Sequence, residues 1–345
     1  MTMHNATPQR CLQAIVLAGL LLSSAASQAI DFKIATLAPD GTTWMQELRK
    51  GSDEIARRTE GRVVFKYYPG GSMGNDRSVM RKVRAGQLHG GMLTAGALSD
   101  AYPDAQLYSL PFLFHSYAEL DYVRARMDKT LAQGIEAHNF VTFGLSDGGF
   151  AYLMSNTPTR RIEDLKGQKI WIPEGDEIAR AMFETLGVSS TPLPLTDVLT
   201  GLETGLISTV GSSASAAIAL QWHTKVKYAA DVPIMYLYGA LAVDKKAYAR
   251  LSSADQATVR EVMERIFTGL NRQNRIDDSN AREALRRQGI QYLAMPPEEI
   301  VRLRAAADTT IEALGKKNTY SPALLKILRG HLDTYRRQHA AAAPP

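Results

Sequence analysis

Three aromatic side chains occupy positions from which they could bind a small molecule. Trp44 begins a helical pattern just after a strand-like segment, Trp171 ends an apolar strand-like segment, and Tyr238 lies near the start of another. Strand ends and helix starts line the ligand crevice of open α/β sheets. A ring placed there can stack on a solute, and beside a carboxylate such as Glu174 it can bind a cation. Core or hinge packing is an equally common use of such rings, so both interpretations stay open.

One short motif could indicate catalysis. Residues 144–148 have the pattern G-x-S-x-G, in which Ser146 would be the nucleophile of an exported hydrolase. That motif requires a helix directly after the serine, with an acid and a histidine further along, whereas residues 149–152 continue as strand. A turn between two strands is the simpler interpretation. We therefore expect a protein that is not an enzyme and keep the hydrolase only as an alternative.

No motif indicates a metal or another cofactor. The glycine-rich residues 69–74 lack the Gly-Lys-Ser/Thr ending of a phosphate-binding loop, and the seven histidines show no paired metal-ligand spacing. The single cysteine, Cys11, lies near the N-terminus, before an apolar run. A chain processed after that run would have no thiol for disulfides or thiolate metal sites.

The N-terminus has the pattern of a secretory signal peptide. Arg10 supplies a positive charge, residues 12–22 are apolar but short for a membrane span, and small residues lead to Ala29. We predict a signal peptide over residues 1–29, cleaved after Ala29, and an exported chain that does not itself span the membrane. The basic residues are scattered rather than gathered in one stripe, which together with export disfavours nucleic-acid binding.

The rest of the chain alternates strand and helix patterns, as α/β proteins do. Expected strands cover residues 32–37, 62–68, 140–146, 152–155, 169–172, 236–243 and 290–293, with a break at Gly148 and Gly149. Expected helices cover residues 44–59, 75–85, 176–186, 196–204 and 254–287, and two more helices precede the C-terminus. The helix over residues 254–287 would be about 50 Å long, enough to run across two domains.

These elements predict two α/β lobes with more than one chain crossing between them. The first lobe would contain residues 30–148 and about 239–275, and the second residues 149–238 and about 276–340. Residues 341–345 would form a frayed tail. A crevice between two such lobes suits hinge closure around a small solute.

Five segments, in this order, resemble the periplasmic solute-binding proteins of tripartite ATP-independent periplasmic (TRAP) transporters. They are residues 68–74 (YPGGSMG), 110–114 (LPFLF), 162–167 (IEDLKG), 186–192 (LG and TP at its two ends) and 197–205 (DV, then GLETG). The resemblance covers about residues 32–332. It implies a two-lobed periplasmic binding protein fold with hinge strands and a long bridging helix, no catalysis, and delivery of a small solute to a paired membrane permease. We expect the binding protein itself to be a monomer.

The sequence departs from the resembled family where that family commonly holds an organic acid. Members often carry an arginine in the segment after Leu-Lys-Gly, where this chain has Trp171. A second arginine often follows the turn near Gly149, where Phe150 and Ala151 stand, and an asparagine often occupies a place taken here by residues 211–213. A bidentate arginine–carboxylate contact supplies charge and geometry that tryptophan lacks.

Two interpretations of the ligand follow. In the first, the solute is still a small organic acid, held by Arg77 or by backbone amides and the hydroxyls of Thr94, Ser212 and Ser213, with Trp171 stacked on an aromatic or sugar-like part. In the second, the solute is neutral or cationic and binds in the aromatic and acidic pocket described first. We favour the first, because ligands of the resembled family are mostly acids.

Overall fold

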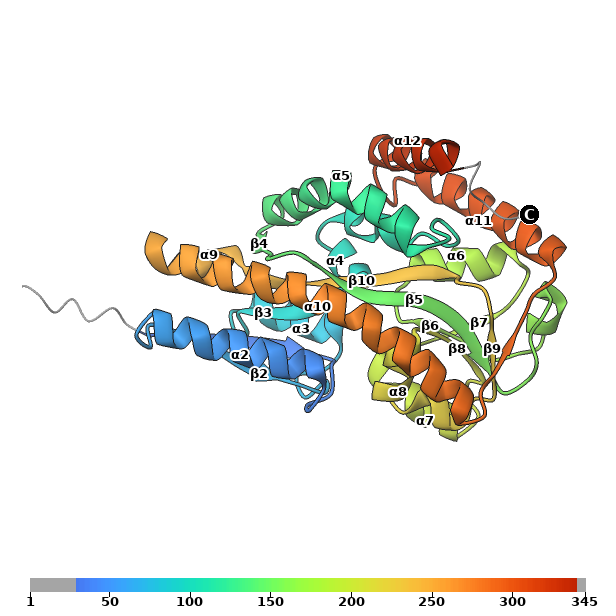
Figure 1. The fold of residues 1–345 in the computed structure, drawn as a ribbon, viewed down its shortest axis with the longest axis horizontal. Coiled ribbons are helices and arrows are strands. Elements are labelled where there is room, and N and C mark those ends of the chain that lie inside the picture. The colour runs from blue at the N-terminus through green and yellow to red at the C-terminus, as the bar shows by residue number, and fades with distance from the viewer. Residues whose placement is uncertain (1–28, 340–345) are drawn as a thin grey trace, which may run out of the picture.

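The chain folds into two α/β lobes that share a twisted sheet (Figure 1). The computed structural model describes residues 29–339, so most of the expected signal peptide and the expected tail lie outside the described residues. The main path of the sheet has the strand order β2-β1-β3-β10-β5-β8-β6-β7. Strands β1 to β3 belong to the first lobe and strands β6 to β8 to the second, whereas β5 and β10 connect the two.

The strands are β1 (Ile30–Thr36), β2 (Val63–Tyr68), β3 (Gly90–Thr94), β4 (Phe140–Val141), β5 (Leu145–Ser155), β6 (Ile170–Pro173), β7 (Ser190–Leu193), β8 (Thr209–Ser212), β9 (Tyr228–Ala230), β10 (Met235–Asp244) and β11 (Gln291–Leu293). The helices are α2 (Thr43–Arg58), α3 (Asp76–Arg84), α4 (Ala95–Ser99), α5 (Tyr117–Ala137), α6 (Glu177–Thr185), α7 (Val198–Glu203), α8 (Ala214–Ala219), α9 (Lys245–Tyr248), α10 (Ser253–Arg287), α11 (Pro297–Lys316) and α12 (Pro322–His339). Short 3-10 turns cover Pro103–Ser109, Ile162–Leu165, Leu195–Asp197 and Trp222–Lys225.

Strands β5 and β10 are the hinge strands. They pair antiparallel over most of their length, and β10 then pairs with β3 while β5 pairs with β8. The predicted break at Gly148 and Gly149 is wrong, because β5 continues through both glycines. Leu237 pairs with Gly149 and Tyr238 with Asp147, which leaves Gly148 as the extra residue of a β-bulge. Gly149 has φ +85°, a backbone conformation that favours glycine, so the pair allows the strand to bend without ending.

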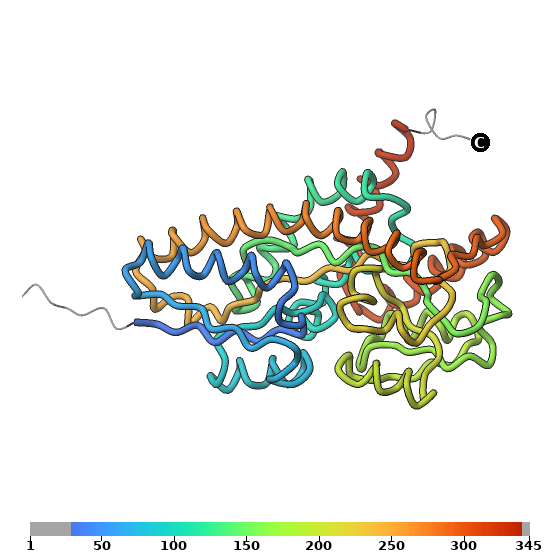
Figure 2. Tube along the Cα trace, turned by 60° about the horizontal axis from the view of Figure 1, so that its bottom comes forward, coloured from blue at the N-terminus to red at the C-terminus, as the bar shows by residue number. Residues whose placement is uncertain are grey.

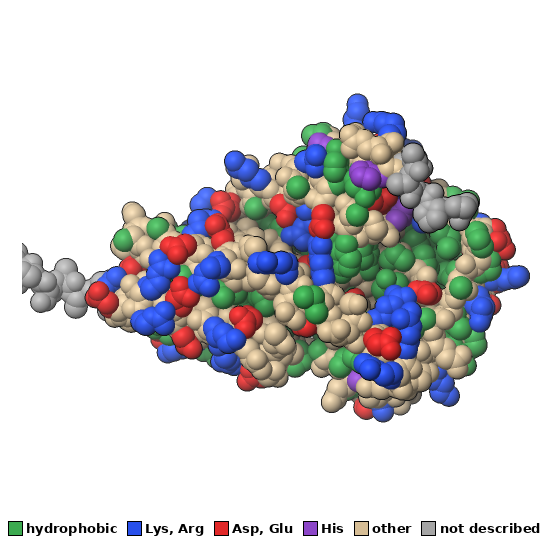
Figure 3. Space-filling model, viewed as in Figure 1, with side chains coloured by type: hydrophobic (Ala, Val, Ile, Leu, Met, Phe, Trp, Pro, Cys, Tyr) green, Lys and Arg blue, Asp and Glu red, His purple; other side chains and the backbone are tan. Residues whose placement is uncertain are grey.

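The long helix α10 confirms the prediction made for residues 254–287. Ser252 caps it by accepting a hydrogen bond from the amide of Asp255. The helix packs on α2 in the first lobe and on α8 in the second, and the tube view follows it along both lobes (Figure 2). On the face that carries α10, basic and acidic side chains are interspersed over the first lobe, without one basic stripe (Figure 3).

Helix α5 was not predicted, and it organises the packing of the C-terminal region. Its Leu120 and Val123 share a buried cluster with Leu93 of β3 and with Leu328 and Leu332 of α12. Helix α12 therefore packs on α5, whereas the division drawn from the sequence put residues 276–340 with the second lobe. Figure 1 shows α12 stacked above α5 and α11.

Candidate solute-binding site

The two lobes meet along a line of contacts that we call the interlobe seam. It brings together Gly71, Asn75 and Arg77 from the first lobe with Glu174, Gly175 and Thr196 from the second. The side-chain amide of Asn75 donates a hydrogen bond of 3.3 Å to Glu174. A β carbon built on Gly71 would lie 2.9 Å from the Thr196 methyl carbon, and one built on Gly175 would lie 1.8 Å from Arg77 Nη2. The lobes are thus in direct contact in this structure.

Two of the residues expected to bind the solute, Arg77 and Thr94, lie next to Asp76, the first along the chain and the second through hydrogen bonds. The Thr94 hydroxyl donates a 2.7 Å hydrogen bond to an Asp76 oxygen, and the Thr94 amide donates one of 3.3 Å to the same oxygen. Burial raises the pKa of Asp76, which the two hydrogen bonds from Thr94 partly oppose. Both Arg77 and Thr94 are exposed, and Glu174, a third expected residue, faces Asn75 across the seam. The structure therefore places Arg77 and Glu174 at the interlobe seam, with Thr94 bound to the neighbouring Asp76.

Trp171 lies inside the second lobe. Its side chain is only 6% exposed, and its indole N–H donates a 3.0 Å hydrogen bond to the carbonyl of Leu193 on the neighbouring strand β7. Its ring meets Trp222 edge-on, with 5.2 Å between ring centroids. Trp222 is buried in the same cluster. In this conformation the one polar atom of Trp171 already has a protein partner.

The other two rings lie in different parts of the molecule. Tyr238 is buried in the first lobe, and its hydroxyl donates to the carbonyl of Ala105. Trp44 is half-buried on α2 and packs edge-on against Phe267 of α10. Trp44, Trp171 and Tyr238 belong to three separate hydrophobic clusters, so they do not enclose one aromatic pocket in this structure.

Ser212 and Ser213 lie where β8 leads into α8, close to the bulge of β5. Both are buried: the Ser212 hydroxyl donates to the carbonyl of Ser213, and the Ser213 hydroxyl caps α8 by accepting from the amide of Ala216. A β carbon built on Gly149 would lie 3.2 Å from the β carbon of Ser213. The two serines therefore lie at the hinge.

The hydrolase motif has no catalytic geometry. Ser146 is buried within β5 and pairs with Gly239 of β10, and the strand runs on past the motif instead of turning into a helix. An exposed nucleophile at a strand-to-helix turn is what the motif would require.

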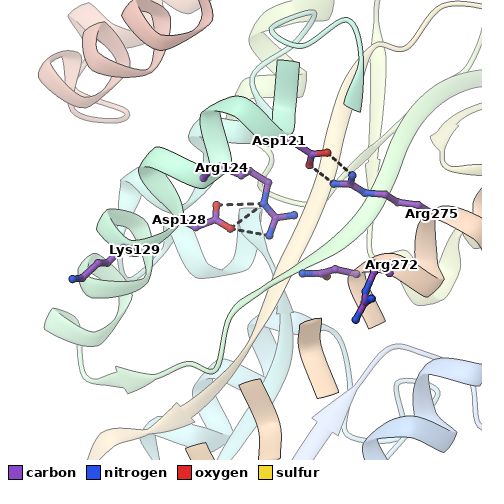
Figure 4. Close-up of a pocket in the computed structure, with 8 residues that line it drawn as sticks. Asp121, Arg124, Asp128, Lys129, Arg272 and Arg275 are labelled. Carbon is purple, nitrogen blue, oxygen red and sulfur yellow. Dashed lines mark hydrogen bonds and ion pairs between the residues drawn. The ribbon is translucent and has the colours of Figure 1, made fainter. Parts of the chain in front are cut away.

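A groove lies on the face of the molecule between α5 and α10, next to the hinge (Figure 4). It measures about 550 Å³, and its charged lining residues are Asp121, Arg124, Asp128, Lys129, Arg272 and Arg275. Arg124 donates to Asp128, to the Tyr236 hydroxyl and to the Leu145 carbonyl. Because these three groups already accept its hydrogen bonds, Arg124 connects α5 to the hinge strands β5 and β10 instead of binding a ligand in the groove.

The open edge of β5 receives side chains from α10 in place of a neighbouring strand. The Asn271 amide accepts from the backbone N–H of Asp147 at 2.8 Å and donates to the carbonyl of Leu145 at 2.9 Å. Asn274 donates to the carbonyl of Asp147 at 2.8 Å. Strand β8 pairs with β5 only from Tyr152 onward. The bonds from α10 therefore satisfy the backbone groups of Leu145 and Asp147, which β8 does not reach.

Asn75, Asp76 and Gly175, which lie in or beside the seam, were not among the residues expected from the sequence. Asp76 and Asn75 follow the glycine-rich loop at the start of α3, so the segment Gly74-Asn75-Asp76-Arg77 was the available signal. Gly175 gave no signal, because its partner lies in the other lobe. Within residues 29–339, no cluster of three or more acidic, histidine or cysteine side chains could hold a metal ion. In that same part of the chain, no helix is both long and apolar enough to cross a membrane.

Two lobes, two hinge strands, a long bridging helix and a contact seam define the class of two-lobed solute-binding proteins. The chain belongs to the bacterial extracellular solute-binding protein family 7, whose family model matches residues 34–318. The solved structures it resembles are TRAP periplasmic solute-binding proteins, which confirms the resemblance seen in the sequence.

Three of these proteins illustrate the similarity. A solute-binding protein of Chromohalobacter salexigens is 24% identical over 259 residues, which cover 74% of this chain and 77% of the relative. The structure of a TRAP periplasmic solute-binding protein from Xanthobacter autotrophicus with bound β-D-galacturonate is 21% identical. Its TM-score is 0.80, with 88% of this chain and 99% of that chain covered. A homologous structure from Sulfurospirillum deleyianum with bound succinate has a TM-score of 0.79 at 19% identity, with the same coverage.

Proposed function

We propose that this chain captures a small organic acid between its lobes in the periplasm and delivers it to a TRAP-type membrane permease. Membership of the family supports the binding role, and the galacturonate and succinate of the two similar structures support an acid as the solute. The observation that carries the proposal is the interlobe seam, because lobes that touch across a boundary can enclose a solute between them. Export through a cleaved signal peptide and a monomeric state are part of the same proposal.

The binding groups we propose are Arg77, Thr94 and the neighbouring Asp76. Arg77 is the cation at the seam, and in the absence of an arginine at position 171 it would attract the carboxylate of the solute. The exposed Thr94 hydroxyl and the Asp76 carboxyl would bind hydroxyl groups of a sugar acid. Ser212 and Ser213 remain candidates at the hinge. We place Trp171 and Tyr238 behind the site, because a backbone carbonyl already accepts the hydrogen bond of each.

A neutral or cationic solute is the second candidate. Glu174 lies at the seam, and Asp76, Asp176 and Glu177 lie within two residues of seam residues along the chain. Burial raises the pKa of both aspartates. This acidic surrounding would suit a cation better than an anion. The positive charge of Arg77 opposes the binding of a cation. The acids bound in the similar structures also lead us to prefer an anionic solute.

A thermal-shift panel tests the solute class. The panel contains D-galacturonate, succinate, the neutral D-galactose and choline, each at millimolar concentration. A ligand at a hundred times its dissociation constant stabilises the fold by about 2.7 kcal/mol, which raises the unfolding midpoint measurably. We expect galacturonate or succinate to raise it and galactose to have no effect. A larger rise of the unfolding midpoint with choline or galactose would favour a cationic or neutral solute over an acid.

The variant Arg77→Gln then tests the proposed cation. It should abolish most of the shift produced by an acid, whereas Arg272→Gln, a change at an exposed arginine on α10, should leave the shift intact. Transport needs its own test: deletion of the gene should stop uptake of the stabilising acid by the intact cell. Unimpaired uptake would leave a binding protein with a sensing role instead.

A further inference from the structure

The Arg77 side chain of the first lobe lies directly against Gly175 of the second lobe. A β carbon built on Gly175 would lie 1.8 Å from Nη2 of Arg77, 2.6 Å from Cζ and 3.2 Å from Nε. The guanidinium therefore occupies the space into which a β carbon at position 175 would project. Any residue other than glycine at this position would displace the guanidinium from that position.

The second lobe offers a matching charge around Gly175. Glu174 precedes it, and Glu177 begins α6 two residues later. Hydrogen bonding to Arg180 is the main reason that the pKa of Glu177 is lowered, and Arg77 adds to this effect from across the seam. Asn75, two residues before Arg77, donates to Glu174. A cation and an amide on one lobe thus face two carboxylates on the other.

The seam also has an apolar part that does not depend on Arg77. Ile178 of α6 is buried in the same cluster as Val79 of α3 and Leu93 of β3, which belong to the first lobe. Apolar contact of this kind favours closed lobes without selecting one relative position of the two. The contact of Arg77 with Gly175 instead requires one specific relative position of the two lobes.

We infer that Arg77 and Gly175 form a latch that fastens the closed lobes. The inference deepens the proposed function, on which its benefit to solute binding rests. The latch exists only when the lobes touch, so it stabilises the closed state relative to the open one. A solute that binds the closed state then binds more tightly in proportion to the closed population.

The chain supplies a matched control for the latch. Gly167 has φ +82° and Gly175 has φ +81°, so alanine meets the same backbone strain at both. A β carbon on Gly167 would have nothing within 4 Å, whereas one on Gly175 meets Arg77. The difference between Gly167→Ala and Gly175→Ala therefore isolates the contact with Arg77.

The experiment measures the distance between the lobes in solution. Gln87 of the first lobe and Lys227 of the second are exposed and become cysteines for spin labels, in the full chain with Cys11→Ser. Distance distributions are recorded without solute for the unchanged latch, Arg77→Ala, Gly175→Ala, the double variant and Gly167→Ala. Calorimetric titration with D-galacturonate is the second measurement.

We expect Arg77→Ala and Gly175→Ala each to lower the ratio of closed to open molecules about two- to fivefold, as for an exposed charged contact. The double variant should lower it no further, since both changes remove the same contact. Gly167→Ala should leave the distances unchanged. Additive effects in the double variant, unchanged distances in either single variant, or an equal effect of Gly167→Ala would overturn the latch. Failure of galacturonate to bind any of the proteins would count against the proposed solute, while the distances still decide on the latch.

Discussion

Arg275 of α10 and Asp147 of β5 form an ion pair at the hinge, with 2.8 Å between Arg275 Nε and Asp147 Oδ2. The Asp147 side chain has no exposed surface, and the same guanidinium also binds Asp121 of α5. Arg275 therefore connects the hinge strand, the long helix and α5 at one point. Figure 4 shows its ion pair with Asp121.

Removal of Arg275 should destabilise the fold. Arg275→Ala leaves the buried Asp147 carboxylate with the amide of Gly149 as its described hydrogen-bond donor. Loss of one partner of a buried pair costs about 3–5 kcal/mol, and we expect about 2–3 kcal/mol here because the Arg275 side chain is 26% exposed. Chemical denaturation measures the free energy of unfolding. Arg272→Ala, on the exposed face of the same helix, should change it by less than about 0.5 kcal/mol, and an equal loss in both variants would refute the bracing role.

Trp171→Ala should destabilise the second lobe. The change opens a cavity against Trp222 and leaves the carbonyl of Leu193 without its indole donor, with an expected loss of about 3–5 kcal/mol. Trp44→Ala, at a half-buried position, should lose less. At a temperature where Trp171→Ala stays folded, its affinity for the solute shows whether the ring only packs inside the lobe or also contacts the solute.

A loss of binding free energy beyond about 1 kcal/mol would indicate that the ring contacts the solute.

Two glycines should respond to alanine in opposite directions. A β carbon on Gly239 of β10 would lie 2.4 Å from the backbone oxygen of Leu93, which the sheet holds in place, so Gly239→Ala should lose several kcal/mol or fail to fold. Gly269 lies on the exposed side of α10 with nothing within 4 Å of its β carbon. Gly269→Ala should gain about 0.5–1 kcal/mol from helix propensity. Unfolding midpoints of both variants measure this, and stabilisation by Gly239→Ala would contradict the packing described for β3 and β10.

His115 should make the fold less stable in mild acid. Burial, with a contribution from Arg336 and Arg304, lowers the pKa of its imidazole from 6.5 to about 4, although Glu119 opposes the shift. The unfolded chain then binds a proton near pH 6.5 that the folded chain binds only near pH 4, so stability falls as the pH drops through this window. The expected effect is about 1–2 kcal/mol, discounted for a side chain that is 35% exposed. Denaturation at pH 7 and pH 4.5 should show a smaller difference for His115→Gln than for the parent, and an identical difference would remove His115 as the cause.

The predictions that succeeded rest on patterns local to the chain. The cap at Ser252 and the apolar positions after it indicate α10 without reference to the rest of the molecule. Helix α5 is harder to predict, because Glu119 and Arg124 are buried among its apolar residues and interrupt the apolar periodicity of the helix. Their partners, Arg336 of α12 and Tyr236 of β10, lie more than a hundred residues away, so no local pattern reveals why charges are tolerated there.

Patterns along the chain are sufficient to predict the α/β class, the long bridging helix and the family, because periodicity, caps and ordered motifs are properties of neighbouring residues. Tertiary structure decided which way the key side chains point. Trp171 lies at the strand predicted for it, yet only the packing of β7 and Trp222 directs its ring into the core. Gly148 reads as a break until the pairing of β5 with β10 makes it a bulge. Arg77 and Gly175 meet only because the lobes close. A contact between segments so far apart in the chain produces no pattern in the sequence around either residue.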